Sequence, residues 1–349
     1  MTLTTIGWAV VHSLWQGALV AGLTALVLSL VPGRRARLRY ALASLALAVI
    51  VVGSGLAALT AVDLLGYATR RQIYPVIDDA IGMPVVVQWR AAIVQSAAIL
   101  WISGISIGLL RLALEWRRAR TLGSRDLADA GVTVRRLVAD LRGRLGVETA
   151  VRVFRSTRVT VPMVVGWRRP SILLPAASVD ALSSTELRAV LAHELAHVGR
   201  RDYPANLAQA AADLLLFHHP AARWISRRIR AEREYCCDDV AVAIGGVRDY
   251  AHALSTIEES RAGLLAVAAG SGTLLDRIQR IAGRPRPALT PLRGALALVV
   301  SATIAAVILT LSMIVPPSLP LDVKMRSRTP PSGVVVPPDA QMLPRKSAR

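Results

Sequence analysis

The stretch Ser183-Ser-Thr-Glu-Leu-Arg-Ala-Val-Leu-Ala-His-Glu-Leu-Ala-His197 decides how the part of the chain between the apolar runs folds. Ser183 followed three residues later by Glu186 forms a capping box, which predicts the start of a helix. On that helix His193 and His197 lie four residues apart and share one face, with the carboxylate of Glu194 beside them. This spacing is typical of a zinc-hydrolase half-site, so we expect one bound zinc ion and Glu194 as the general base.

The chain also carries four long apolar runs without charge. Of its 349 residues, 53% are hydrophobic, which favours an integral membrane protein. Each run has about 20 residues or more, the length that a helix needs to cross the hydrocarbon core of a bilayer. We therefore expect four transmembrane helices, at residues 5–31, 40–62, 91–110 and 294–315.

Arginine clusters beside these runs predict their orientation. If the N-terminus is outside, all three clusters face the cytoplasm, as basic residues next to membrane helices usually do. Basic residues in the tail oppose this orientation, but three clusters outweigh one. The net charge of +19 is thus explained by membrane flanks, and we expect no direct binding of nucleic acid. The clusters are Arg34, Arg35, Arg37 and Arg39; Arg111, Arg117, Arg118 and Arg120; and Arg284, Arg286 and Arg293.

These observations predict a mainly α membrane protein with a cytoplasmic α+β zincin-like metallopeptidase domain that contains a small sheet. The expected domains are a three-helix membrane domain at 1–115, the metallopeptidase domain at 116–292, the fourth span at 294–315 and a tail at 316–349. The tail is rich in proline and cannot bury a core, so we expect it to be extracytoplasmic and disordered.

The expected sheet comes from short β-branched runs before the active-site helix. An amphipathic helix is predicted at residues 134–145, followed by strands at 151–154, 159–165 and 172–174. A sheet followed by an active-site helix is the order found in zincin peptidases, in which an edge strand pairs with the substrate backbone. Residues 172–174 are the candidate for that edge strand.

A catalytic zinc ion needs a third protein ligand, and acidic residues on a later helix can supply it. In the helical run that begins near residue 221, Glu234 and Asp238 lie four apart and face the same way. One carboxylate can then bind the metal while the other orients a ligand imidazole. The alternative is a solvated charged helix in which these acids pair with nearby arginines. The acids are Glu232, Glu234, Asp238 and Asp239, and the arginines are Arg227, Arg228, Arg230 and Arg233.

Several other polar or reactive side chains are candidates for a role. Adjacent side chains on a helix diverge by about 100°, so Cys236 and Cys237 cannot both bind one metal, and we expect small buried hydrophobes in a reducing compartment. His12 and Gln16 share one face of the first span, where we favour hydrogen bonding in helix packing over a functional role. Candidate donors to an oxyanion are Tyr235, His218 and His219.

Three stretches resemble one family, the beta-lactam-sensor, antirepressor-type membrane metallopeptidases of bacteria. They are His193-Glu-Leu-Ala-His-Val-Gly-Arg-Arg-Asp202, Gly166-Trp-Arg-Arg-Pro-Ser-Ile-Leu-Leu-Pro175 and Arg233-Glu-Tyr-Cys-Cys-Asp238. The resemblance covers roughly residues 1–315 and implies a gluzincin site. It implies His193, His197 and Glu234 as zinc ligands, Glu194 as the catalytic base and Asp238 as a residue that orients a ligand. Asp202 also matches, with either a structural or a functional role.

The resemblance implies a zinc endopeptidase in the bacterial plasma membrane that cleaves a cytoplasmic regulator, such as a transcriptional repressor. The endopeptidase itself is a further candidate substrate. Members that sense beta-lactams carry a penicillin-binding domain after the fourth span, and we expect none here, because the tail contains no Ser-x-x-Lys motif. Two alternatives stay open: a membrane quality-control protease and a non-enzymatic signal transducer. The oligomeric state, a dimer among the options, is also open.

Overall fold

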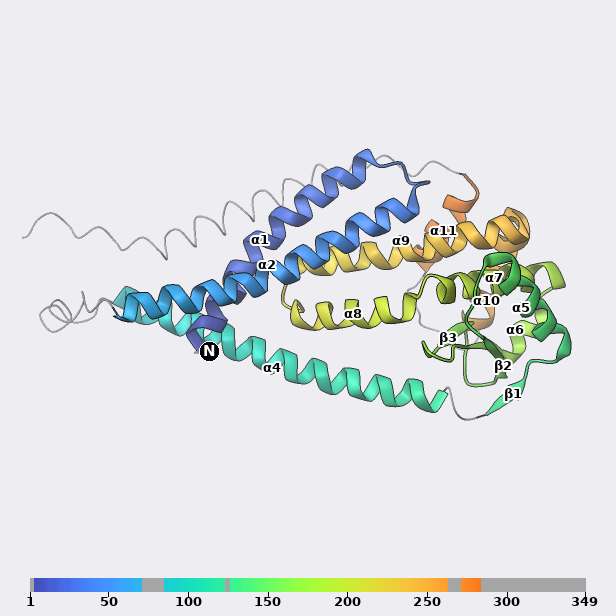
Figure 1. Cartoon of the computed structure of the whole chain (residues 1–349), viewed down its shortest axis with the longest axis horizontal. Helices are drawn as coiled ribbons and strands as arrows, with labels where there is room; N and C mark the ends of the chain where they lie inside the picture. Colours follow the sequence, from blue (N-terminus) through green and yellow to red (C-terminus); the bar gives the residue numbers. More distant parts are fainter. Residues whose placement is uncertain (1–2, 71–84, 123–125, 263–270, 284–349) are drawn as a thin grey trace, which may run out of the picture.

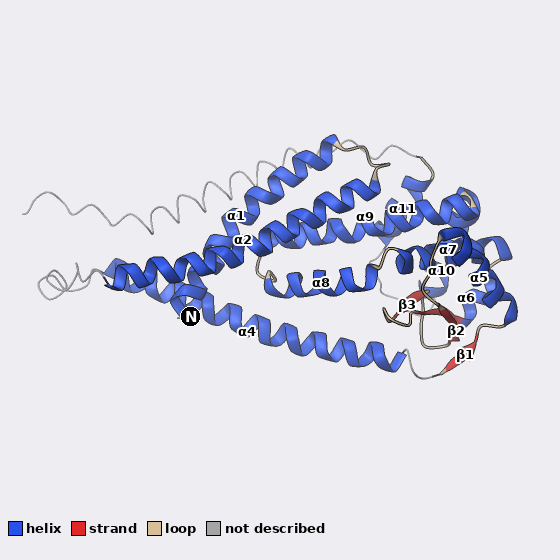
Figure 2. Cartoon of the chain, in the orientation of Figure 1, coloured by secondary structure: helices blue, strands red, loops and turns tan. Residues whose placement is uncertain are grey.

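A computed structural model gives the fold and describes residues 3–70, 85–122, 126–262 and 271–283. Helices make up most of it, with a small sheet at one end (Figure 2). The strands are β1 (Leu127–Asp129), β2 (Arg152–Ser156), β3 (Met163–Val165) and β4 (Ser171–Pro175). The helices are α1 (Leu3–Leu30), α2 (Ala36–Arg70), α4 (Val85–Leu122), α5 (Val132–Leu145), α6 (Ala176–Ala181), α7 (Ser184–Gly199), α8 (Asp202–Leu215), α9 (Pro220–Gly245), α10 (Val247–Ala262) and α11 (Ser271–Ile281).

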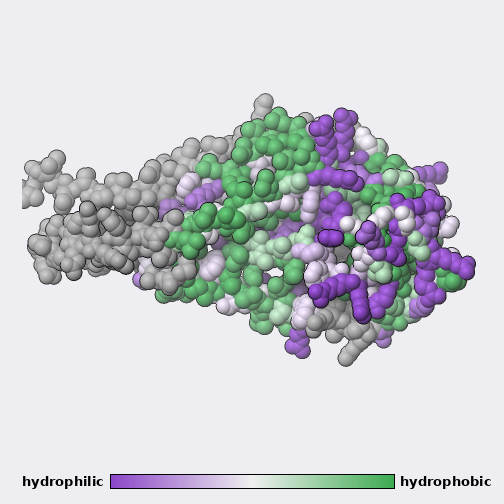
Figure 3. Space-filling view, in the orientation of Figure 1, coloured by the Kyte–Doolittle hydropathy of each residue, from purple (hydrophilic) through white to green (hydrophobic). Residues whose placement is uncertain are grey.

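Three helices are long and apolar enough to cross a membrane, namely Leu3–Leu30, Ala36–Leu59 and Ala92–Arg117. They correspond to the first three predicted spans. Leucines such as Leu23, Leu45 and Leu100 are exposed on them, and the apolar surface gathers over these helices while hydrophilic residues gather at the other end (Figure 3). Such a band of exposed apolar side chains is expected of helices that face lipid. The predicted fourth span and the tail lie outside the described residues.

The α1–α2 turn and the C-terminal end of α4 lie at the same end of the molecule as the sheet (Figure 1). The first two arginine clusters belong to these two segments, so they lie on one side as the orientation rule requires. Which side of a membrane this is stays a prediction. In α1, His12 accepts a hydrogen bond from Trp15 of the same helix, with 3.2 Å between Nδ1 and Nε1.

The sheet is mixed, with the strand order β1-β2-β4-β3. β4 runs parallel to β2 and antiparallel to β3. The prediction that residues 172–174 form the edge strand is therefore wrong: β4 is central and all five of its residues are buried, whereas β1 and β3 are the edges. A continuous apolar run such as Ser171–Pro175 belongs in the interior of a sheet, because both of its faces are covered. β1 had no signal strong enough to predict it.

The core of the α+β part lies between this sheet and two helices. Leu141 of α5 and Leu191 and Leu195 of α7 are fully buried against Ile172 and Leu174 of β4. The predicted capping box is confirmed at the start of α7, where Glu186 N–H donates to Ser183 Oγ and Ser183 N–H donates to Glu186 Oε2. The sheet and the cap together fix where α7 begins and which of its faces is buried.

Helices α8 and α9 form a hairpin that returns between the membrane helices, with α1 and α2 on one side and α4 on the other (Figure 1). The tip of the hairpin, residues 216–219, packs against glycines of the membrane helices. A Cβ atom on Gly17 of α1 would lie 2.1 Å from Nε2 of His219, and one on Gly104 of α4 would lie 2.1 Å from the ring of Phe217. Behind the tip, one apolar cluster joins the hairpin to α1 and α2; it includes Ala21, Ala43, Leu47, Leu216, Ile225 and Ile229.

A buried ion pair joins the beginning of α2 to α9. Nε of Arg39 lies 2.7 Å from Oε1 of Glu232, and both side chains are almost fully buried. The same guanidinium donates to the carbonyl oxygens of Leu28 and Val31 at the end of α1. Arg228 also pairs with Glu232, at 3.0 Å. Arg39, one of the arginines of the first cluster, therefore fastens the membrane helices to α9.

Candidate active site

Helix α7 carries three of the predicted site residues. His193 and Glu194 are buried, at 6% and 7% exposure, and His197 is partly buried. The two imidazole rings meet edge to face with their centroids 4.9 Å apart, and their Nε2 atoms are separated by 3.2 Å. The i and i+4 spacing therefore brings both nitrogens to one point beside the helix.

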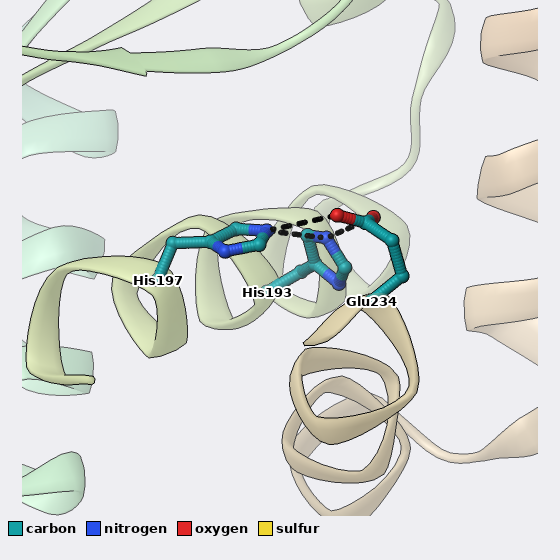
Figure 4. A group of neighbouring side chains, drawn as sticks. All are labelled: His193, His197 and Glu234. Atoms are coloured by element: carbon teal, nitrogen blue, oxygen red, sulfur yellow. Dashed lines mark hydrogen bonds and ion pairs between the residues drawn. The ribbon is translucent and has the colours of Figure 1, made fainter. Parts of the chain in front are cut away.

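Helix α9 brings Glu234 to the same point (Figure 4). Its Oε2 lies 3.6 Å from Nε2 of His193 and its Oε1 lies 3.8 Å from Nε2 of His197. Around a tetrahedral zinc ion with ligand bonds of about 2.0–2.2 Å, neighbouring donor atoms are about 3.3 Å apart. The three donors are grouped closely enough for one metal ion. Two imidazole nitrogens and a carboxylate are also the donor set that catalytic zinc uses in other hydrolases.

The far side of each imidazole is occupied by another hydrogen-bonding group. Nδ1 of His197 lies 2.8 Å from Oδ2 of Asp202, the first residue of α8. Nδ1 of His193 lies 2.8 Å from the hydroxyl of Tyr250 and 3.4 Å from Oδ1 of Asp238. With each Nδ1 engaged in this way, the Nε2 atoms are left for the shared point, which is the arrangement that metal-binding histidines need.

The charges around this point favour a cation. Burial alone would raise the pKa of Glu234, but contact with His193 and the nearby charge of Arg277 lower that pKa to about 2. Burial alone would lower the pKa of His193, but the carboxylates of Asp238 and Glu234 raise it to about 9. Asp238 likewise has a lowered pKa, because contacts with His193 and Arg277 outweigh its burial. The surroundings thus keep Glu234 and Asp238 ionised and favour a positive charge on His193.

A cavity of about 800 Å³ opens in front of these residues. Its walls come from several elements, including the edge strand β3 with Met163 and Val164, and helix α10 with Leu254. Glu194 also lines the cavity, next to the histidines. A cavity of this size with an apolar wall and a few polar groups can hold several residues of an extended peptide.

Other predicted candidates lie elsewhere. Glu232 is bound to Arg39 and Arg228, away from the cavity. His219 begins α9 and donates from Nε2 to the carbonyl of Ser13 in α1, while His218 contacts Ser13 Oγ. Cavity-lining residues of the described chain do not include Tyr235, His218 or His219, so the three suggested oxyanion donors are not supported.

Both cysteines are buried and free, as expected for small apolar residues. Cys237 lies behind His197, with its Sγ 3.4 Å from Nδ1 of that histidine and 3.8 Å from Oδ2 of Asp202. Burial raises the pKa of the Cys237 thiol, so it remains a neutral donor to Asp202.

Two residues of the site had no signal in the sequence. Tyr250 comes from α10 and Arg277 from α11, and both line the cavity. Arg277 donates to both oxygens of Asp238, at 2.6 and 3.1 Å, and lies 3.4 Å from Oε2 of Glu234. Neither residue belongs to a short motif, and the packing of α10 on α7 and α9 and of α11 on α9 brings them to His193.

Comparison with known proteins gives the family of the chain. Residues 62–281 match the family described as BlaR1 peptidase M56, and this match covers more than half of the chain. The chain therefore belongs to the BlaR1 peptidase M56 family, which confirms the resemblance found in its motifs. The regulatory protein BlaR1 of Bacillus licheniformis is 31% identical over 84 residues, a stretch that covers 24% of this chain and 14% of the relative. Family membership and three membrane-length helices mark the chain as a membrane protein of a peptidase family.

Proposed function

We propose that the chain is a zinc endopeptidase of the bacterial plasma membrane, with His193, His197 and Glu234 as the zinc ligands. The observation that carries the proposal is the convergence of these three donors within 4.8 Å of one another, next to the carboxylate of Glu194. A bound zinc ion supplies Lewis-acid chemistry, which polarises the scissile carbonyl and makes water a nucleophile at neutral pH.

The protein groups have separate tasks in this proposal. Glu194 takes the proton of the attacking water and passes it to the nitrogen of the leaving amine. Asp202 and the Tyr250–Asp238 pair hold the two imidazoles in position. The edge strand β3 lines the cavity and has an unpaired side among the described residues, so an extended substrate can add to the sheet there. This places the substrate-pairing role on residues 163–165 rather than on 172–174.

The proposed substrate is a cytoplasmic regulator, such as a transcriptional repressor. The second proposed substrate is the chain itself. The family match and the printed description of the relative as a regulatory protein support this choice. The α8–α9 hairpin supports a signalling role for the same chain, because it runs from the membrane helices to Asp202 and Glu234. In this scheme the N-terminus is outside and the catalytic part faces the cytoplasm.

Zinc content tests the site first. We expect about one zinc ion per purified chain. Glu234→Ala should lose most of this zinc, because the two ligands that remain bind the ion poorly. Glu194→Gln is the matched variant, because it removes the proposed base and leaves all three ligands. It should keep its zinc and lose hydrolysis of a quenched fluorescent peptide library. A wild-type protein that takes up no zinc after reconstitution would refute the peptidase proposal and favour a non-enzymatic transducer.

Substrate breadth separates regulation from quality control. A regulatory protease should cut few proteins, whereas a quality-control protease should degrade many unfolded membrane proteins. Quantitative proteomics of cells with wild-type protein and with Glu194→Gln provides the comparison. If Glu194→Gln retained the full biological response, signalling would not require proteolysis.

A further inference from the structure

The hydroxyl of Tyr250 lies at the centre of a buried network behind His193. Tyr250 is fully buried, and its hydroxyl oxygen lies 2.8 Å from Nδ1 of His193, 2.7 Å from Oδ1 of Asp238 and 2.9 Å from NH2 of Arg277. Asp238 is also fully buried. Nothing in the sequence motifs assigns a role to Tyr250 or Arg277.

The donors and acceptors of this network can be assigned one by one. Arg277 can only donate hydrogen bonds, and its Nε and NH2 both donate to Asp238. Asp238 is therefore an ionised carboxylate, which can only accept hydrogen bonds. The hydroxyl of Tyr250 has one hydrogen, which it donates to Asp238. Its oxygen then accepts from Arg277 and has room for one more donor, which is Nδ1–H of His193.

From this assignment we propose that Tyr250 is the positioning residue that keeps the proton of His193 on Nδ1 and leaves Nε2 free to bind zinc. The inference rests on the proposed zinc site. Asp238 then acts on His193 through Tyr250, because its own contact with Nδ1 is 3.4 Å long whereas the hydroxyl contact is 2.8 Å long. The role expected for Asp238 is thereby divided between two residues.

The two ligand histidines differ in this respect. His197 is held directly by a carboxylate, Asp202, whereas His193 is held by a neutral hydroxyl. The carboxylate of Asp238 is paired with Arg277, with 2.6 Å between Oδ1 and NH2. The hydroxyl of Tyr250 therefore joins His193 to the Asp238–Arg277 pair.

Zinc affinity of the full chain in detergent micelles tests this role. The affinity is measured by competition with a chromophoric zinc chelator at fixed pH, below the melting temperature of each metal-free variant. We expect Tyr250→Phe to weaken zinc binding by about 10- to 100-fold, the usual effect of losing a partner of a metal-binding histidine. Tyr235→Phe is the matched control. It removes a hydroxyl from a second buried tyrosine, which belongs to α9 and does not line the cavity. It should bind zinc like the wild type.

A double variant tests whether Asp238 acts through Tyr250. Asp238→Asn should weaken zinc binding in the wild-type background and add much less in the Tyr250→Phe background, because linked residues are not additive. Equal effects in both backgrounds, or unchanged affinity in Tyr250→Phe, would overturn the inference. In either of those cases the proposed function still stands if His197→Ala loses zinc. A wild-type chain that binds no zinc would overturn both.

Discussion

At the scale of single residues, the turn between α7 and α8 explains how Asp202 reaches His197. Arg201 has a φ of 57°, in the left-handed region that L-residues seldom adopt. Arg201 lies between α7 and α8, directly before Asp202, whose carboxylate reaches Nδ1 of His197. Such a conformation in a non-glycine residue beside a cavity is consistent with a functional constraint.

Removing Asp202 should weaken the site from this side. In Asp202→Ala, His197 loses the acceptor for its Nδ1 proton, and we expect zinc affinity to fall by about 10- to 100-fold. Asp213→Ala is the matched control, because it removes a partly exposed aspartate from the same helix, where it pairs with Arg230 at 2.9 Å. Chelator competition measures both variants. Equal zinc affinity in Asp202→Ala and the wild type would show that Asp202 has only a structural role.

The sequence predicted His193, Glu194, His197 and Glu234 together, because helical spacing and one family motif were enough to place them. Their roles stay predictions, but the structure brings them to one cavity. The family resemblance chose Glu234 over Glu232, and the structure adds a physical reason, because Arg39 of α2 pairs with Glu232. Tyr250 and Arg277 could not be found in this way, because tertiary packing alone brings α10 and α11 to the site.

At the scale of secondary structure elements, the fit between α1 and the hairpin tip depends on a missing side chain. Gly17 leaves the space into which His219 fits, and His219 donates from Nε2 to Ser13 while its Nδ1 accepts from the first N–H groups of α9. This one imidazole therefore caps α9 and joins it to α1.

Gly17→Ala should disturb the packing of α1 against the tip of the α8–α9 hairpin. The added methyl group would overlap Nε2 of His219, and we expect a loss of about 1–3 kcal/mol in the free energy of unfolding, as in other overpacked cores. Gly53→Ala in α2 is the control, since no described atom lies within 4 Å of its Cβ position. Thermal melting in detergent compares the two. Identical melting temperatures would mean that the tip is not packed as described.

The elements themselves differed in how far the sequence could predict them. Long uncharged runs predicted α1, α2 and α4, because length and hydrophobicity decide a membrane span. Strand order was not predicted, since β3 and β4 are both short apolar runs, and only the pairing of β4 with both β2 and β3 shows that β4 is central. The return of α8 and α9 into the membrane helices also had no signal, because an amphipathic helix does not reveal its partner.

At the scale of the whole molecule, zinc should stabilise the fold. The three proposed ligands come from α7 and α9, so a bound ion joins two elements that meet only in the folded chain. A ligand that binds only the folded state at about 100 times its Kd adds about 2.7 kcal/mol to the free energy of unfolding. We expect the melting temperature to fall on treatment with a chelator and to recover with zinc. His197→Ala should show no such response.

The position of the α8–α9 hairpin has a practical consequence for anyone who wishes to isolate the part that holds the candidate active site. The apolar faces of Leu216, Ile225 and Ile229 are covered by α1 and α2, and they would be bare in a fragment that lacks those helices. Exposed apolar patches of this kind drive aggregation. A fragment of residues 126–283 should therefore be insoluble when expressed alone, so that compounds that bind the candidate site must be screened on the whole chain in detergent or lipid.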